Sequence, residues 1–292
     1  MQTVKHFFLI ALCTAFIAGL CTLGFASESV STKDHYFAHL QKQLIADGFN
    51  AAQIQALYSS PSVYFDTKGV STYFVYREGK LNYDQFLADE PIQNAKIYLE
   101  THKNAMLRAE QEFGVSRYAI AAILLVETRL GTYVGNRSVF NTLSTMAALS
   151  DPKVRSILWQ TVSAESRLSV EEYAEKARKK SGWAYQELKA FLRYTAKEGL
   201  NPLEIIGSFA GAMGYCQFMP SNISLYAKDG NGDGRIDLFT HADAIMSIAG
   251  YLRHYGWHAD ISREQAYKVV YNYNRSRYYV ETVLKIIEML RR

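Results

Sequence analysis

The stretch Ser116–Gly131 reads SRYAIAAILLVETRLG, and its spacing of apolar residues decides the fold class of this region. Ile120, Ile123 and Leu124 recur at helical intervals, and the next position on the same face is Glu127. The serine at the start of the stretch can cap a helix, and the glycine at its end can terminate one. We therefore predict a helix with Glu127 in its last turn.

A carboxyl group on the apolar face of a helix has two explanations. Burial and the negative end of the helix dipole both raise the pKa of such a carboxyl, which suits a general acid that holds its proton near neutral pH. The alternative is a structural ion pair between Glu127 and an arginine such as Arg129 or Arg137. Position alone leaves both explanations open.

A second unusual stretch, Gly207–Pro220, reads GSFAGAMGYCQFMP. Its glycines and alanines permit a close approach of the backbone, while Ser208 and Gln217 supply neutral hydrogen-bonding groups. This combination predicts the wall of a binding site, and the alternative is a glycine-lined helix contact. Cys216 has no activating base nearby in the sequence and is interpreted as a small buried residue.

The next stretch, Asp229–Asp237, reads DGNGDGRID and follows the first nine positions of an EF-hand-like calcium loop. The twelfth position departs from the pattern, because Thr240 stands where a bidentate Glu is expected, and Asp243 could replace it. The alternative is an Asp-Gly turn that binds no calcium. The predicted metal ligands are Asp229, Asn231, Asp233, the backbone carbonyl of Arg235, and Asp243.

The N-terminus and the composition predict an exported globular protein. An apolar run from Phe7 to Phe25 precedes a small-x-small site ending at Ala26, so residues 1–26 are predicted to be a signal peptide. An uncleaved membrane anchor is the alternative, and lipidation at Cys21 is disfavoured because Leu20 precedes it. After removal of these residues Cys216 is the only cysteine, so no internal disulfide can form.

The formal charge of +4 is spread along the chain and does not indicate nucleic-acid binding. It permits peripheral contact with an anionic cell envelope. The 21 tyrosines supply aromatic surface with a polar group, which suits a carbohydrate groove, although most single tyrosines pack in a core. We predict that the chain is a monomer.

The rest of the chain predicts a mainly α fold with at most a small β element. Capping patterns at Asn50, Ser169 and Asn201 each predict the start of a helix. The aromatic and β-branched pieces between Pro61 and Asn82 predict a small hairpin or an extended segment. We predict an N-terminal helical part over residues 27–111 and a site-bearing part over residues 112–292, which includes the calcium loop at 229–243.

The ordered motifs Val126–Gly131 and Ser208–Pro220 together resemble the membrane-bound lytic murein transglycosylase B family. The similarity extends from about Pro91 to the C-terminus. Leu125, Leu130 and Cys216 depart from the family, which often has Gly, Trp and Gly at these positions. The arginine pair that follows the catalytic helix in the family has no clear counterpart here.

The resemblance implies a lysozyme-like catalytic core with additional helices, located in the periplasm or cell envelope. It implies cleavage of the N-acetylmuramic acid–N-acetylglucosamine bond of peptidoglycan, with a 1,6-anhydromuramoyl end as product and no cofactor for the chemistry. A structural calcium ion occurs in one member type, with its loop at the place of residues 229–243. Glu127 matches the catalytic acid and base, and the implied substrate contacts are Ser208, Gln217, Phe218, Tyr251, Tyr273 and Asn274.

Two other functions remain open at this stage. A hydrolytic muramidase would use the same groove but admit water as the nucleophile. A non-catalytic, calcium-dependent peptidoglycan-binding protein would retain the groove without turnover.

Overall fold

The computed structural model describes residues 32–75, 82–166 and 168–292. The predicted signal peptide at residues 1–26, and the alternative anchor, lie outside the described residues. Residues Ser31–Arg292 form one compact unit. None of the helices in the described ranges combines the length and the apolar character that crossing a bilayer requires.

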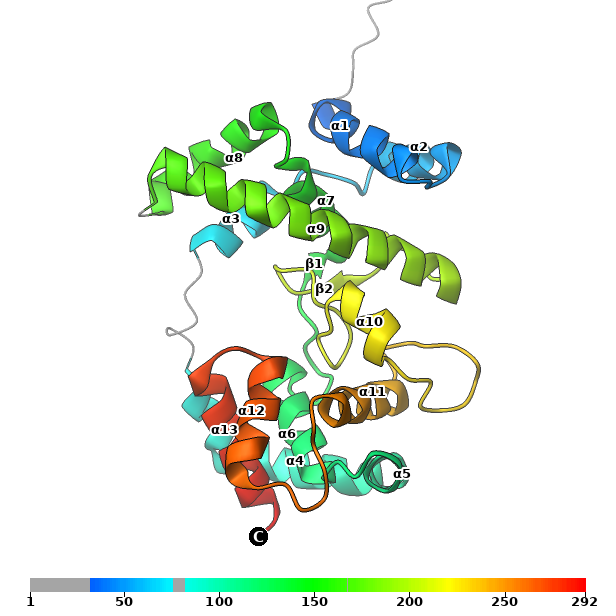
Figure 1. Cartoon of the computed structure of the whole chain (residues 1–292), viewed down its shortest axis with the longest axis vertical. Coiled ribbons are helices and arrows are strands. Elements are labelled where there is room, and N and C mark those ends of the chain that lie inside the picture. The colour runs from blue at the N-terminus through cyan, green and yellow to red at the C-terminus, as the bar shows by residue number, and fades with distance from the viewer. Residues whose placement is uncertain (1–31, 76–81, 167) are drawn as a thin grey trace, which may run out of the picture. The chain divides into compact units, whose positions relative to one another are not determined.

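The prediction of a mainly α fold with a small β element is confirmed (Figure 1). The elements, in chain order, are α1 Thr32–Ala46, α2 Ala51–Ser59, α3 Thr67–Val75, the 3-10 helix η2 Tyr83–Leu87, α4 Asp89–Thr101, α5 Lys103–Phe113, α6 Arg117–Thr128, β1 Arg137–Ser138, α7 Val139–Ala148, α8 Pro152–Glu165, α9 Val170–Glu198, β2 Ile206–Gly207, α10 Pro220–Tyr226, α11 His241–His254, α12 Arg263–Tyr273 and α13 Arg277–Leu290. The two short strands pair antiparallel, with Arg137 opposite Gly207.

The helices pack in two groups (Figure 1). In the first group α7 contacts α9 and α1, and α3 contacts α8; in the second, α6 contacts α13 and α4, and α5 contacts α11. The short helix α10 contacts both α9 and α11, so it links the two groups. Helices that precede Gln111 occur in both groups, and the domain division near Gln111 stays a prediction.

Helix α7 lies at the centre of the first group, and every one of its residues is buried. Three of its polar side chains bond to the end of α2 and to the chain that follows it. Ser144 Oγ lies 2.9 Å from Tyr58 Oη, Asn141 Nδ2 donates to the Ser62 carbonyl at 3.0 Å, and Thr145 Oγ1 accepts from the Asp66 backbone N–H at 2.9 Å. Because buried polar groups need partners, these bonds fix the path of residues 58–66 across α7.

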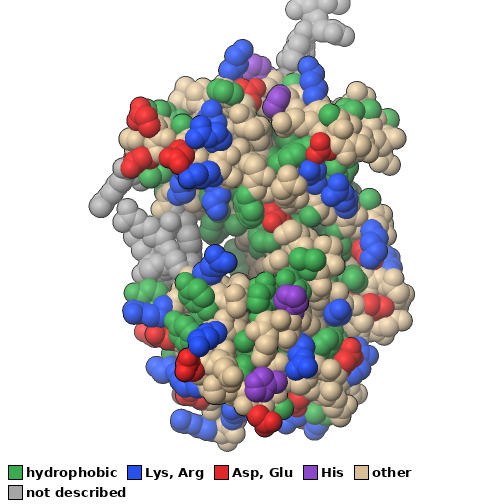
Figure 2. Space-filling view, in the orientation of Figure 1, with side chains coloured by type: hydrophobic (Ala, Val, Ile, Leu, Met, Phe, Trp, Pro, Cys, Tyr) green, Lys and Arg blue, Asp and Glu red, His purple; other side chains and the backbone are tan. Residues whose placement is uncertain are grey.

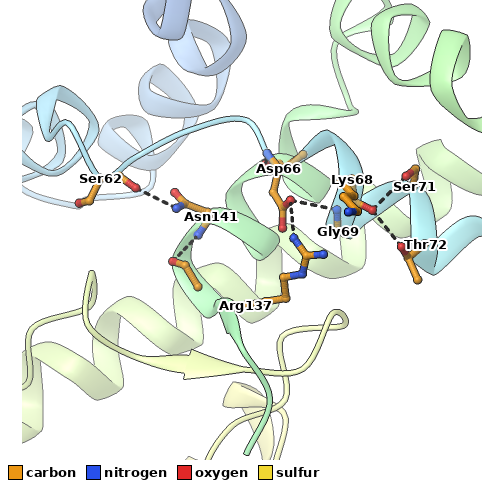
Figure 3. Close-up of polar contacts among 10 residues, drawn as sticks. Ser62, Asp66, Lys68, Gly69, Ser71, Thr72, Arg137 and Asn141 are labelled. Carbon is orange, nitrogen blue, oxygen red and sulfur yellow. Dashed lines mark hydrogen bonds and ion pairs between the residues drawn. The ribbon is translucent and has the colours of Figure 1, made fainter.

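Figure 3 shows the end of this path, where Asp66 lies between two partners. Its Oδ1 accepts from the Gly69 backbone N–H at 2.9 Å and pairs with Arg137 Nη1 at 3.3 Å. The Asp66 side chain is only 3% exposed, so the pair ties the start of α3 to β1 from inside the protein.

In the described part of residues 61–82 the hairpin alternative is wrong, and the extended alternative holds for a few residues. Residues 63–66 are extended, but their polar groups bond to α7 rather than to a partner strand. Residues Thr67–Val75 form a helix, because the Asp66 side chain receives the Gly69 N–H in the first turn.

The capping predictions hold at Asn50 and Ser169, whose side chains accept backbone N–H groups at the starts of α2 and α9. At Asn201 the prediction of a helix is wrong, because residues 202–204 make only a turn before the chain enters β2. There the Asn201 side chain accepts from Leu203 N–H and donates to Glu204, which completes the turn locally.

Candidate active site

The predicted helix that carries Glu127 is α6, and Glu127 is half-buried in its last turn. The serine at its start occupies the capping position, but its side chain makes no capping bond in the described structure. The helix ends at Thr128 rather than at Gly131, because Arg129 and Leu130 already have left-handed backbones, with φ of 49° and 63°. Two consecutive residues other than glycine with positive φ are costly, at roughly 1–3 kcal/mol each.

Thr128 fixes the end of α6 against the second motif. Its Oγ1 donates to the Tyr215 carbonyl at 3.0 Å and accepts from the Gly131 backbone N–H at 3.0 Å. This position is 1% exposed, so both bonds are shielded from water. The helix that bears the acid and the stretch Gly207–Pro220 are thereby held together.

The Glu127 side chain lines a cavity of about 290 Å³. The cavity is lined by Asn82, Tyr83, Gln85, Phe86, Val126, Glu127, Thr128, Arg129, Tyr133, Asn274 and Tyr279. Among these described residues Glu127 is the one acidic side chain.

Tyr279, in the first turn of α13, donates its hydroxyl proton to Glu127 Oε1 at 2.7 Å. The Tyr279 side chain is 1% exposed. Burial, and next the charge of Glu127, hold the pKa of this phenol well above its ordinary value. The phenol therefore stays protonated at any physiological pH and acts as a permanent donor that orients one carboxyl oxygen.

The two arginines considered as structural partners of Glu127 have other partners. Arg137 pairs with Asp66 at 3.3 Å, and Arg129 Nη2 donates to Gln85 Oε1 at 3.0 Å. The ion-pair explanation of Glu127 through either arginine therefore receives no support.

Ser208 and Gln217 both bond to backbone near the cavity. Ser208 Oγ accepts from the N–H groups of Ala210 and Ala212, at 3.2 and 3.1 Å. Gln217 Nε2 donates to the carbonyls of Val134 and Gly214, at 3.2 and 2.9 Å. Neither lines the cavity of Glu127, and their bonds hold the wall in shape.

The predicted aromatic contacts pack as a cluster beneath the site. Phe218 and Tyr251 are 2% and 5% exposed, and the Phe218 ring lies 5.6 Å from Tyr251 and 6.0 Å from Tyr273. Tyr273 Oη donates to the Cys216 carbonyl at 2.5 Å, and Tyr251 Oη donates to the Asn272 carbonyl at 2.7 Å. Asn274, which follows α12, is the predicted contact that shares the cavity with Glu127.

The small residues of the Gly207–Pro220 wall allow the protein backbone to approach itself. A Cβ at Gly207 would lie 2.1 Å from the Ala212 carbonyl oxygen. A Cβ at Gly214, whose φ is +73°, would lie 2.4 Å from the Leu238 Cβ. Cys216 is fully buried and unpaired with another cysteine, as predicted, and burial raises the pKa of its thiol.

The predicted calcium loop is closed by its own backbone. Asp229 accepts N–H groups from three loop residues, led by Gly234 at 2.8 Å on Oδ2, and these bonds lower the pKa of its carboxyl. Asp243, on α11 and 1% exposed, accepts from Gly230 N–H at 2.8 Å and Asp237 N–H at 2.7 Å. Asp243 thus bonds to the backbone of the loop, and its role as a calcium ligand stays a prediction.

The remaining predicted ligands lie on the exposed side of the loop. Asn231 Nδ2 donates to Asp233 Oδ2 at 2.8 Å, while the Arg235 side chain turns away to donate to the Glu198 carbonyl. Within the described residues no group of three or more His, Cys, Asp or Glu side chains is close enough together to hold a metal ion. A cation in this loop would therefore also need the amide oxygen of Asn231 and the backbone carbonyl of Arg235 as ligands.

Two parts of the cavity were not predicted from the sequence. They are Tyr279 and the η2 segment with its preceding cap, which contributes Asn82, Tyr83, Gln85 and Phe86. For Tyr279 the sequence carried only a weak signal. Tyr279 lies on the strongly apolar face of α13, where a buried phenol requires a hydrogen-bond partner. The partner is Glu127, which lies 152 residues away in the sequence. The two side chains meet because α13 packs on α6.

Comparison with known proteins places the chain in a family. The family model of the transglycosylase SLT domain matches residues 32–265. Membrane-bound lytic murein transglycosylase B of Escherichia coli (strain K12) is 35% identical over 173 residues, 59% of this chain. The chain spans 40% of the length of this curated relative.

Two solved structures share the fold. SltB3 of Pseudomonas aeruginosa, in complex with NAG-anhNAM-pentapeptide, superposes with a TM-score of 0.70 at 19% identity and covers 89% of this chain and 80% of its own. Escherichia coli Slt35 in complex with calcium has a TM-score of 0.64 at 22% identity and covers 88% and 92%. The lysozyme-like fold is therefore confirmed, and because the family model matches most of its length, the chain belongs to the transglycosylase SLT domain family.

Proposed function

We propose that the protein is a lytic transglycosylase, which cleaves the N-acetylmuramic acid–N-acetylglucosamine bond of peptidoglycan glycan strands and leaves a 1,6-anhydromuramoyl end. The observation that carries the proposal is Glu127, the one acid among the described residues of a cavity where a buried tyrosine donor orients it. Membership of the transglycosylase SLT domain family supports the same activity.

The chemistry requires one protein carboxyl group. Protonated Glu127 gives its proton to the glycosidic oxygen as the bond to the anomeric carbon breaks. The resulting carboxylate then takes the proton of the muramic acid 6-hydroxyl, whose oxygen closes onto the anomeric carbon. Most glycosidases that use water or a covalent intermediate have a second carboxylate near the first. The lining of the cavity supports the scheme with a substrate nucleophile.

The protein groups around Glu127 have separate roles in this scheme. The Tyr279 hydroxyl donates to Oε1 and orients the carboxyl group toward the glycosidic oxygen. Asn274 contacts the sugar from the cavity. Ser208, Gln217, Phe218, Tyr251 and Tyr273 form and support the wall along which the strand lies.

The mass of the products tests the proposal. Digestion of purified sacculi should release muropeptides one water lighter than those of a hydrolase. Products of full hydrolytic mass would identify a muramidase instead. Binding to sacculi without any released product would identify a non-catalytic peptidoglycan-binding protein.

Replacing Tyr279 by phenylalanine should lower turnover roughly 10- to 100-fold, because a hydrogen bond to a charged group contributes roughly 1.5–3 kcal/mol. The rate of anhydromuropeptide release and the melting temperature should be measured together. Tyr278→Phe, which changes a neighbouring tyrosine that is 51% exposed, is the matched control and should leave the rate unchanged. Equal rates in the two variants would contradict the role of Tyr279.

We propose that residues 229–243 bind a structural calcium ion. Three side chains and one backbone carbonyl at positions 1, 3, 5 and 7 of the loop supply the oxygen ligands that calcium prefers, with Asp243 added from α11. Slt35, a protein of the same fold, was crystallised with calcium. When bound, the ion would neutralise the loop carboxylates and would take no part in the chemistry.

Calcium should therefore raise the melting temperature. At a concentration about 100 times the Kd the stabilisation is about 2.7 kcal/mol, or roughly 5–10 °C for a domain of this size. Magnesium at the same concentration is the control, because it demands a smaller and more rigid site. A variant with Asp229→Asn and Asp233→Asn should lose the shift. If neither calcium nor a chelator changes the melting temperature, residues 229–243 do not bind calcium.

We also infer that the chain is exported and works as a monomer in the periplasm or at the cell envelope, where its substrate lies. The name of the curated relative, a membrane-bound murein transglycosylase, supports this location. Cell fractionation and light scattering test the two statements. Recovery in the cytosolic fraction would contradict the first, and a dimer mass the second.

A further inference from the structure

A cavity of about 440 Å³ lies between α4, the start of α6 and the end of α13. Leu290, at the end of α13, lines it together with Tyr118, in the first turn of α6. Glu127 and Tyr279 meet at the opposite ends of the same two helices. From Tyr118 to Glu127 the axis of α6 extends roughly 14 Å, at about 1.5 Å per residue. The two cavities share no lining residue.

Cationic side chains dominate the lining of this cavity, which we call the basic cavity. They come from separate places in the fold: Lys96 on α4, Lys103 on α5, Arg117 on α6, and Arg291 with Arg292 after α13. Among the described lining residues the one acidic side chain is Glu100, and Lys103 already pairs with it at 3.4 Å.

Most of this positive charge has no counterion in the protein. Lys96, Arg291 and Arg292 are exposed and form no ion pair with any side chain in the described ranges. Arg117 pairs with Glu110 at 3.4 Å. Because like charges repel one another, an anion that binds between the three unpaired cations is attracted by all of them.

The floor of the basic cavity is apolar. Leu99 and Leu290 are 8% and 5% exposed, and the half-buried Tyr118 ring lies 5.2 Å from the Arg117 guanidinium carbon. Lysine and arginine stems lie well on apolar surface while their charged ends reach the solvent, and tyrosine is enriched where a membrane meets water. Exposed cations above such a floor match the headgroup region of a membrane.

The arrangement of the cations favours a surface of many anions over one small ion. A single phosphate is held best by donors that surround it closely, whereas these cations lie on different elements and their ends are exposed. Figure 2 shows Lys and Arg side chains around the lower end of the molecule, near the end of α13 in Figure 1.

We propose that the basic cavity docks the protein on a membrane surface by binding the phosphate groups of anionic phospholipids. Because the cavity of Glu127 lies at the other end of α6, the docked protein keeps that cavity turned away from the membrane and open to glycan strands. The inference goes beyond the proposed function, since docking requires no turnover at Glu127.

Sedimentation with lipid vesicles tests the proposal. The exported protein should bind vesicles of phosphatidylcholine and phosphatidylglycerol, and added salt should weaken the binding. The triple variant Lys96→Gln, Arg291→Gln and Arg292→Gln should bind about 100-fold more weakly, because each lysine or arginine near an anionic surface contributes roughly a factor of five. Neither protein should bind vesicles of phosphatidylcholine alone.

The matched control is the triple variant Lys42→Gln, Lys153→Gln and Arg178→Gln. These three cations are exposed on α1, α8 and α9, form no ion pair among the described side chains, and lie outside the basic cavity. The control loses the same charge, but its binding should weaken less than about threefold, because salt screens charges that lie away from the lipid surface. Both variants should keep the melting temperature of the wild type.

Three results would overturn the docking site. Unchanged binding of the first variant would mean that the basic cavity does not touch the vesicle, and equal losses in both variants would mean that net charge alone causes binding. Release from the vesicles by inorganic phosphate, but not by sodium chloride of the same ionic strength, would identify a site for a small anion instead.

The orientation has its own test. Protein bound to vesicles should release anhydro products from soluble glycan strands at the rate of the unbound protein. Inhibition by the vesicles would mean that the cavity of Glu127 faces the membrane, and would overturn the orientation. Vesicle binding itself is measured without substrate, so a failure of the proposed function would leave the docking result unaffected.

Discussion

Replacing Glu127 by glutamine is expected to lower the release of anhydromuropeptides from purified sacculi by about 10³-fold or more. General acid and base catalysis each contribute roughly 10²–10⁴-fold, and in the proposed scheme one side chain provides both. Glutamine has the size of glutamate, but it can neither give up a proton to the glycosidic oxygen nor accept one from the 6-hydroxyl. No second acid lines the described cavity to replace it.

The fold should survive this substitution. The Tyr279 hydroxyl can donate to the amide oxygen of glutamine as it does to Glu127 Oε1. Sacculus binding and the melting temperature of the Glu127→Gln variant should therefore match those of the wild type, while product release is lost. Glu100→Gln is the control for a carboxyl group, because the Glu100 side chain is 76% exposed on α4. Activity of Glu127→Gln equal to that control would rule out Glu127 as the acid.

The position of the acid could be predicted because it depends on local sequence. The helical spacing of Ile120, Ile123 and Leu124 fixes which face of α6 is buried, and a carboxyl group on that face stands out without knowledge of any other element. The calcium prediction for the loop at Asp229 likewise rests on local spacing of oxygen-bearing residues, and it stays a prediction. The end of α6 was less predictable, because Thr128 bonds to Tyr215, which is distant in sequence.

The parts that escaped prediction depend on contacts between distant segments. Tyr279 meets Glu127 only because α13 packs on α6. Residues 63–66 were compatible with a strand, but their bonds go to side chains of α7, so no hairpin forms. β-propensity describes a residue that fits a half-buried surface and does not specify the partner. Similarly, the small residues of the wall indicated a close approach, and only the fold shows that Gly207 approaches Ala212.

Replacing Gly207 by alanine is expected to destabilise the protein by about 3 kcal/mol, which lowers the melting temperature by roughly 6–12 °C. Gly207 pairs with Arg137 in the small sheet, and an added Cβ would lie 2.1 Å from the Ala212 carbonyl oxygen and 2.8 Å from Val139 Cγ2. The first neighbour is backbone, so the strand and the wall must separate before the methyl group fits.

The matched control for Gly207→Ala is Gly182→Ala. Gly182 lies inside α9, where a Cβ would meet no heavy atom within 4 Å. Alanine there should stabilise the helix by roughly 0.5–1 kcal/mol, because glycine loses more backbone entropy on folding. Opposite shifts of the melting temperature in the two variants are therefore expected from the same chemical change. A Gly207→Ala protein as stable as wild type would mean that the wall tolerates separation from β1. In that case the Ser208 bonds to Ala210 and Ala212 would not be enough to keep the wall beside Glu127 rigid, because the loop that these bonds close begins at Gly207.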